Sequence, residues 1–132
     1  MAARLILSLA VALVTAGPVH VPATQAWTDS GLDVQRGERL EFRTTGRIAF
    51  GRGANQRATA DGKSDVRSAA YPVASAPAGT LIGKIGSGTP FVIGGHAGSL
   101  TMPDTGRLML GINDNDLGDN SGAFTVSIRP AR

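Results

Sequence analysis

The densest group of side chains that could do chemistry is the stretch 113–122, which reads Asn-Asp-Asn-Asp-Leu-Gly-Asp-Asn-Ser-Gly. Its carboxylates are Asp114, Asp116 and Asp119, and its carboxamides are Asn113, Asn115 and Asn120. Oxygen donors crowded this closely repel one another unless a cation neutralises them. Ca²⁺ is the common hard cation that takes about six to eight oxygens from side chains and backbone, so the stretch is a candidate calcium-binding loop.

The same residue types also make ordinary turns. Asn, Asp, Gly and Ser tolerate positive φ and hydrogen-bond their own backbone, so a metal-free acidic turn has the same composition. The stretch is not a helical calcium-binding loop, because Gly118 comes one position early and Thr125 stands where the bidentate Glu belongs. Two interpretations therefore stay open, a calcium-binding loop and a turn without metal.

Catalytic patterns are absent from the sequence. His20 and His96 are the only histidines, and neither belongs to a Ser-His-Asp order or to a spaced carboxylate pair. His96 lies among glycines and is predicted to be an exposed turn residue. The segment 79–84 resembles a phosphate loop only superficially, because it lacks the required spacing. We therefore predict that the protein is not an enzyme, and a small hydrolase using the acidic cluster is the least favoured hypothesis.

Short alternating segments on both sides must position the acidic loop. Apolar residues run from 108 to 112 before it, and Phe124, Val126 and Ile128 alternate with polar residues after it. Strands are predicted at 19–27, 32–34, 40–44, 47–50, 80–85, 90–93, 100–102, 107–112 and 123–128, with a turn at 29–31. Strands recurring about every ten residues, with Gly-rich turns and no helical period, predict a single all-β domain, an antiparallel β-sandwich of jelly-roll type.

One long segment interrupts this pattern. Residues 54–78 are rich in Gly, Ser, Ala and Pro and show no strand period. Loops of this length in a compact domain are uncommon, and they either carry function or are flexible. The segment contains the only tyrosine, Tyr71, followed by Pro72. A binding loop and a flexible insertion are equally compatible with the sequence.

The N-terminus has the pattern of a secretory signal peptide. A charged start, Met-Ala-Ala-Arg, precedes an uncharged run from Leu5 to Val14 and then small residues. We place the cleavage after Ala16, which makes 1–16 the signal peptide and 17–132 the mature domain, and predicts a secreted or periplasmic protein. Cleavage after Ala26 would remove part of the first strand, and an uncleaved anchor is the remaining alternative. The apolar run is too short to span a bilayer, and nothing later in the chain could span one.

Composition narrows the class of protein further. The 132 residues suffice for one domain, and the absence of cysteine excludes disulfides, thiol catalysis and Cys-based metal sites. Lys and Arg total 13 but are scattered singly, and only one Trp, one Tyr and four Phe are available for stacking. Nucleic-acid binding is therefore disfavoured. The net charge of +3 predicts only a mildly cationic protein.

With the strands and the loop in place, the sequence resembles the LecA-like family of small calcium-dependent galactose-binding bacterial lectins. The segments that carry the resemblance are 27–31, 36–38, 49–51, 81–86, 112–114 and 120–126. They cover nearly the whole mature chain. The last block, from Asn120 to Val126, is the most specific, since the glycine-rich ones occur in many β-sandwiches.

The resemblance implies a set of metal ligands. Asp114 and Asn120 would bind Ca²⁺ through their side chains and Phe50 through its carbonyl, while Asp119 takes the place of the family's first paired Asn. A further carbonyl would come from Leu117 or a neighbour, because the loop is shorter here. Two sugar hydroxyls would complete the coordination shell, and the residues expected to contact the sugar are Tyr71, Asp114, Asp116 and Asp119.

The sequence departs from the family where sugar identity would be set. The family's galactose site adds a His-Pro pair and a glutamine from the middle loop. Here Tyr71-Pro72 stands at the nearest equivalent, and no clear glutamine follows. Tyr71 could offer a ring and a hydroxyl to a sugar, or it could simply pack.

The sequence thus predicts a secreted, non-catalytic domain that binds galactose or a related sugar through bound Ca²⁺. The alternative is a structural or adhesion β-sandwich in which calcium only stabilises the fold or is absent. The expected partner is a galactoside-like glycan. Self-association is an open question, because single lectin sites are usually weak and an oligomer would raise avidity.

Overall fold

The structure is a computed structural model that describes residues 17–95 and 98–131. The predicted signal peptide and His96 lie outside these ranges. The described residues form strands β1 to β10 and no helix, which confirms the all-β class. Crossing a membrane as a helix takes a long apolar helix, and the described part of the chain contains none.

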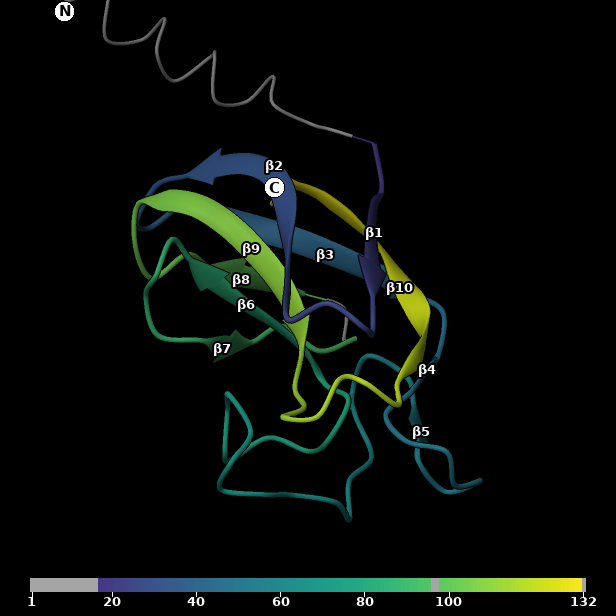
Figure 1. The fold of residues 1–132 in the computed structure, drawn as a ribbon. Coiled ribbons are helices and arrows are strands. Elements are labelled where there is room, and N and C mark those ends of the chain that lie inside the picture. Colours follow the sequence, from purple (N-terminus) through teal and green to yellow (C-terminus); the bar gives the residue numbers. More distant parts are fainter. Residues whose placement is uncertain (1–16, 96–97, 132) are drawn as a thin grey trace, which may run out of the picture.

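The strands form two antiparallel sheets that pack face to face (Figure 1). The six-stranded sheet contains β1 Val19–Pro22, β3 Arg39–Thr45, β4 Ile48–Ala49, β5 Arg57–Ala58, β8 Ser99–Thr101 and β10 Ser121–Pro130. The four-stranded sheet contains β2 Trp27–Val34, β6 Leu81–Ile85, β7 Phe91–Val92 and β9 Gly106–Ile112. The first sheet has the order β5-β4-β10-β3-β8 with β1 also on β10, and the second has the order β2-β9-β6-β7. This is the predicted β-sandwich.

The core lies between the sheets and follows the alternation in the sequence. Leu40 and Phe42 of β3 are buried while their neighbours are more exposed, and Phe124 and Val126 of β10 follow the same pattern. From the other sheet, β9 contributes apolar side chains such as Leu110. Each sheet therefore has one face in the core and one facing out, as an antiparallel sandwich requires.

Strand β10 holds the six-stranded sheet together. It pairs with β3 and β1 over most of its length, and its first residues pair with β4. Between β3 and β4 the chain passes close to β10 at Gly46, where φ is +103° and an added Cβ would lie 2.7 Å from the Ala123 carbonyl oxygen. Only glycine fits this approach, so one continuous stretch of chain supplies two neighbours of β10.

One predicted turn is wrong. The sequence predicted that the first strand ends near Trp27 and that 29–31 forms a turn, but the chain turns at 23–26 and β2 runs unbroken from Trp27 to Val34. The turn residues make a bulge instead, since the register with β9 shifts between Asp29 and Asp33 and Gly31 has φ +80°.

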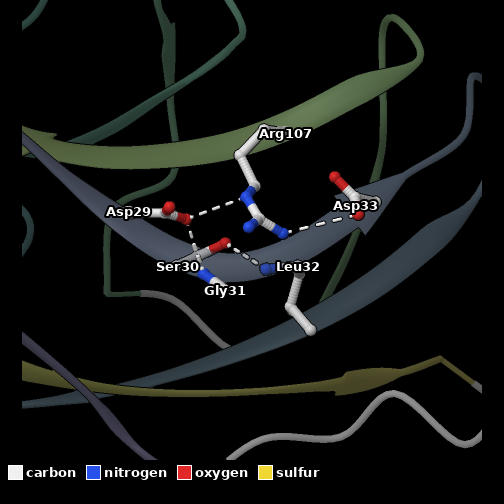
Figure 2. A network of polar contacts seen from close by, with 6 residues as sticks. All are labelled: Asp29, Ser30, Gly31, Leu32, Asp33 and Arg107. Atoms are coloured by element: carbon white, nitrogen blue, oxygen red, sulfur yellow. Dashed lines mark hydrogen bonds and ion pairs between the residues drawn. The ribbon is translucent and has the colours of Figure 1, made fainter.

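Side chains stabilise this bulge locally (Figure 2). The Asp29 carboxylate accepts the Gly31 N–H at 2.8 Å, and the Ser30 hydroxyl oxygen accepts the Leu32 N–H at 3.1 Å. Arg107 of β9 then pairs with Asp29 at 3.2 Å and with Asp33 at 3.4 Å. Residues that favour turns thus form a bulge within a strand here, where the register with β9 sets their conformation.

Candidate functional site

The acidic loop connects β9 of one sheet to β10 of the other, so it crosses one end of the sandwich (Figure 1). At its start Asn113 is 0% exposed, and Asp114 and Asn120 are only 8% and 7% exposed. Buried polar groups at such positions need partners. The partners that each one has, or lacks, define the site.

Asn113 fastens the long loop to the end of β9. Its side-chain oxygen accepts the Val73 N–H at 2.9 Å, and its amide nitrogen donates to the carbonyls of Val73, Ala76 and Pro77 at 3.0, 3.0 and 3.1 Å. Its backbone carbonyl also accepts the Gly79 N–H at 3.0 Å. Composition placed Asn113 among the loop's oxygen donors, but in the structure its side chain holds the segment that contains Tyr71.

Three oxygens of the loop are buried and have no hydrogen-bond partner: Asp114 Oδ2, Asp119 Oδ1 and Asn120 Oδ1. The opposite atom is anchored in two of these side chains. Asn120 Nδ2 donates to the Ala23 carbonyl at 2.9 Å, and Asp114 Oδ1 accepts the N–H groups of Asn115 and Asp116 at 2.8 and 3.3 Å. These two side chains are therefore held in place while Asp114 Oδ2 and Asn120 Oδ1 stay open. Among the described residues the same condition holds at one further atom, Thr44 Oγ1, which lies on β3 outside the loop.

Phe50 is brought beside this loop by strand register. Ala49 of β4 pairs with Ser121 of β10, so the next residue along, Phe50, lies opposite Asn120. The Phe50 N–H donates to the Gln56 carbonyl at 2.8 Å and the Gln56 side chain accepts the Gly53 N–H at 2.8 Å, which closes the β4–β5 connection. The structure thus gathers Phe50, Asp114, Asp119 and Asn120 at one end of the sandwich.

Two other predicted residues are used within the loop itself. Asp116 is exposed, and its Oδ1 accepts the Gly118 N–H at 3.3 Å. The Leu117 carbonyl accepts the Asn120 N–H at 3.2 Å and keeps a second lone pair. Asp116 therefore lies outside the group of buried open oxygens, whereas Leu117 still offers a carbonyl to a ligand.

Tyr71 lies within electrostatic reach of Asp114. Burial of the Tyr71 phenol, and then the negative charge of Asp114, raise the pKa of Tyr71 above the ordinary value of 10.0. The ring also packs against the core cluster. Because Asn113 holds the chain at Val73, two residues away, the tyrosine is part of an anchored segment and not of a free insertion.

The donor set decides which cation could fit. Within 17–95 and 98–131, no three His, Cys, Asp or Glu side chains gather in a way that could hold a metal, so carboxylates alone do not make a site. The open oxygens come from two carboxylates and one amide, beside backbone carbonyls. An all-oxygen set of this kind suits Ca²⁺ and not Zn²⁺ or Cu²⁺.

Sequence reasoning missed the residues that support the loop. The Ala23 carbonyl orients Asn120 from 97 positions away, and Asn113 acts on residues 36 to 40 positions away. No local pattern marks such partners. A polar residue directly after a buried apolar run is the one signal that could have identified Asn113 as a buried anchor.

Comparison with known proteins gives a likeness of fold. The sequence matches no family model and no curated protein. The structure is similar to a solved domain described as "EclA N-terminal domain; PllA-like lectin", with a TM-score of 0.72 and 20% sequence identity over 89% of this chain and 98% of that chain. At this identity the match establishes that the two share a β-sandwich fold.

Proposed function

We propose that this chain is a non-catalytic carbohydrate-binding domain, a lectin, that holds Ca²⁺ at the end of the sandwich and binds sugar hydroxyls there. The observation that carries the proposal is the group of three buried, unpartnered oxygens on Asp114, Asp119 and Asn120. Leaving such atoms unpaired in the native state costs about 1–3 kcal/mol each, so a ligand that satisfies them is expected. The fold shared with a lectin domain supports sugar as the second ligand.

The chain's own oxygens would hold the ion. Asp114 Oδ2, Asp119 Oδ1 and Asn120 Oδ1 would supply side-chain ligands. The backbone candidates are the carbonyl of Phe50, which follows the residue paired with Ser121, and that of Leu117, which accepts the Asn120 N–H. A bound Ca²⁺ would supply a positive charge with room for further oxygen ligands, which two neighbouring sugar hydroxyls can provide. Sugar hydroxyls would take the place of water on such an ion, and no protein group would have to transfer a proton.

Protein groups around the ion would select the sugar. The phenol of Tyr71 stays protonated at neutral pH, so it can donate a hydrogen bond to a sugar oxygen while its ring covers an apolar patch. Asp116 is exposed at the rim of the loop and can accept from a hydroxyl. We propose galactose or a related sugar as the ligand, and a secreted or periplasmic location, where plentiful Ca²⁺ keeps a site of modest affinity loaded.

Titration calorimetry tests this function directly. The metal-stripped domain 17–132 is titrated with Ca²⁺ and then with galactose and a panel of other monosaccharides. We expect Ca²⁺ binding at about one site per chain, sugar binding only afterwards, and loss of both in Asp114→Asn. The matched control is Asp33→Asn, which removes an exposed carboxylate on β2 and should leave both isotherms unchanged. Sugar binding that is equally strong in a chelator would contradict the proposal.

The alternative function is a structural or adhesion module without a sugar site. It is favoured by the way the loop satisfies itself, with Asp116 bonded to the Gly118 N–H and Leu117 to the Asn120 N–H. In that case Ca²⁺ would raise the melting temperature, and no sugar would raise it further. A saturable sugar-dependent shift in melting temperature rules the alternative out.

A further inference from the structure

The outer face of the six-stranded sheet carries an excess of arginine. In β3, Leu40 and Phe42 point into the core, so the residues between and beside them point outward. The outward basic residues on or next to this sheet are Arg39, Arg43, Arg47, Arg57 and Arg129. The one acidic residue in its strands is Glu41.

Strand register joins these arginines to the candidate site. Arg57 of β5 pairs with Ala49, which pairs with Ser121, the residue directly after Asn120. Farther along the sheet Arg43 lies opposite Ser127. The basic face therefore begins beside the acidic loop and continues along β3 and β10, away from the loop.

Most of this charge is not neutralised within the protein. Arg129 pairs with Glu41 at 2.9 Å, and Arg39 donates to the Ser99 hydroxyl. In the described part of the chain, Arg43, Arg47 and Arg57 make no ion pair. The four-stranded sheet differs, because Arg107 is paired with two carboxylates there. Unpaired cations on one face create a positive potential that attracts polyanions.

The face also has a hollow, and its arginines are spaced in a way that suits a chain-like ligand. A shallow hollow of about 130 Å³ is lined by Glu41, Arg43, Ser127, Ile128 and Arg129. Arg39 and Arg43 lie four residues apart on β3, which in an extended strand is about 13 Å, and Arg47 follows four residues later, beyond the end of the strand. Such spacing distributes the cations along the path of an extended polymer.

We propose that this face binds an acidic polysaccharide, a glycan chain bearing carboxylate or sulfate groups, which extends from the candidate calcium site along β3 and β10. Guanidinium groups form paired hydrogen bonds with carboxylate and sulfate oxygens. The proposal rests on the proposed function in the choice of a glycan as the occupant and in the calcium site from which the glycan extends. The charge complementarity depends on the arginines alone and not on the calcium site.

The neutral residues of the face favour a glycan over nucleic acid or a membrane. Between the arginines lie hydroxyl side chains that can bond sugar hydroxyls, namely Thr45, Ser99, Thr101, Thr125 and Ser127. The outward positions of the described strands in this sheet hold no Phe, Tyr or Trp. Nucleic-acid bases have no ring to stack on, and a lipid bilayer has no aromatic or large apolar side chain to anchor.

The test compares a charged and a neutral glycan polymer on matched variants of the domain. Dextran sulfate and unmodified dextran serve as probes, and binding is measured at about 50 mM and 200 mM salt, where screening differs. The test variant is Arg43→Gln with Arg47→Gln, both exposed and unpaired. The control is Arg36→Gln with Lys84→Gln, which removes the same charge away from the face.

We expect dextran sulfate to bind, dextran not to bind along the face, and the affinity for dextran sulfate to fall about tenfold in the test variant only. Equal loss in both double variants, or no loss in the test variant, would overturn the proposal. Duplex DNA or anionic lipid vesicles that bind as tightly as dextran sulfate would overturn the assignment to a glycan.

A chelator separates this proposal from the proposed function. Dextran sulfate binding through the arginines should persist in chelator and in Asp114→Asn, while binding of monosaccharides is lost. If no monosaccharide binds under any condition but the arginine-dependent binding remains, the calcium-site function fails and the basic face stands. If monosaccharides bind with Ca²⁺ but dextran sulfate binds no better than dextran, the basic face fails alone.

Discussion

Two acidic regions of this molecule differ in how the negative charge of their carboxylates is compensated. On β2, Asp29 and Asp33 face Arg107 at 3.2 and 3.4 Å, and their side chains are 54% and 81% exposed (Figure 2). In the loop before β10, Asp114 and Asp119 each keep a buried oxygen that has no partner. The strand acids have their cation in the protein, whereas the loop acids lack one in the described chain.

The difference lies in burial more than in charge. An exposed carboxylate is solvated, so its ion pair stabilises the fold by only about 0–1 kcal/mol and can be dispensed with. A buried carboxylate oxygen without a partner costs about 1–3 kcal/mol or more. Composition does not distinguish the two regions. The buried oxygens without hydrogen-bond partners occur in the loop, and they indicate a ligand there.

The largest expected effect concerns the loop. Asp114→Asn keeps the shape of the side chain but removes the charge, so the affinity for Ca²⁺ should fall at least about 100-fold. Asp33→Asn should leave it unchanged. Calorimetry of both variants measures the difference, and equal Ca²⁺ affinity in the two would remove the distinction between the regions.

The melting temperature of Asp114→Asn, measured with and without Ca²⁺, extends this comparison to stability. Because Asp114→Asn removes an unpaired buried charge, its melting temperature in chelator should equal or exceed that of the parent domain. In saturating Ca²⁺ the order should reverse, since only the parent is stabilised by binding. Differential scanning calorimetry with chelator and with Ca²⁺ measures both melting temperatures. If the parent is not the more stable of the two in Ca²⁺, the proposed metal site is wrong.

The next effect concerns the anchor of the long loop. Asn113→Ala removes hydrogen bonds to Val73, Ala76 and Pro77 and leaves buried backbone groups unpaired, so the free energy of unfolding should fall by about 2–4 kcal/mol. Asn115→Ala, at an exposed position, should change it by less than about 0.5 kcal/mol. Urea unfolding measures both. Faster tryptic cleavage after Arg67 in Asn113→Ala would show that the anchored segment is released.

A spectroscopic effect reports the link between Tyr71 and the loop. Tyr71 is the only tyrosine, so the phenolate absorbance follows its ionisation alone. Burial and the charge of Asp114 raise the pKa of Tyr71, and Ca²⁺ bound at Asp114 should lower this pKa toward the ordinary value. Asp114→Asn should lower it in chelator, and Asp33→Asn should not. An unchanged titration on adding saturating Ca²⁺ would separate Tyr71 from the metal.

The sign of the accompanying stability change follows from proton linkage. The native state keeps the Tyr71 proton at pH values where the unfolded chain has lost it. The stabilisation is therefore complete below the ordinary pKa of 10.0 and is lost as the pH rises through the higher native pKa. Urea midpoints measured on both sides of this range test the direction.

The smallest effect concerns the strand acids. Arg107→Gln removes two exposed ion pairs, so the free energy of unfolding should fall by about 0.5–1 kcal/mol at low salt. High salt should abolish the difference from the parent. A loss of several kcal/mol would mean that the bulge of β2 depends on this arginine far more than an exposed pair allows.

The sequence predicted the fold because alternation is a local property. An alternating apolar pattern predicts a half-buried strand from adjacent residues alone, as at Leu40 and Phe42 or at Phe124 and Val126. The error at β2 has the same origin. Asp29, Ser30 and Gly31 favour a turn locally, and only the register with β9 makes them a bulge.

The candidate site was less accessible to prediction. Residue types made Asp114, Asp119 and Asn120 candidate ligands. Whether their oxygens stay open depends on contacts of the other side-chain atom, which for Asn120 is bonded to the distant Ala23 carbonyl. The same limit hid the role of Asn113. Its four side-chain bonds are made to residues that the sequence marked only as a long irregular loop.

The position of β10 has a consequence for how the protein folds. Strands β1, β3 and β4 all pair with this strand, which follows the other described strands in the sequence. Without residues 121–130, β1 lacks its partner strand, and β3 and β4 lose the strand that joins them. We therefore expect the six-stranded sheet to form only once β10 is available, so that its folding depends on contacts between distant parts of the chain.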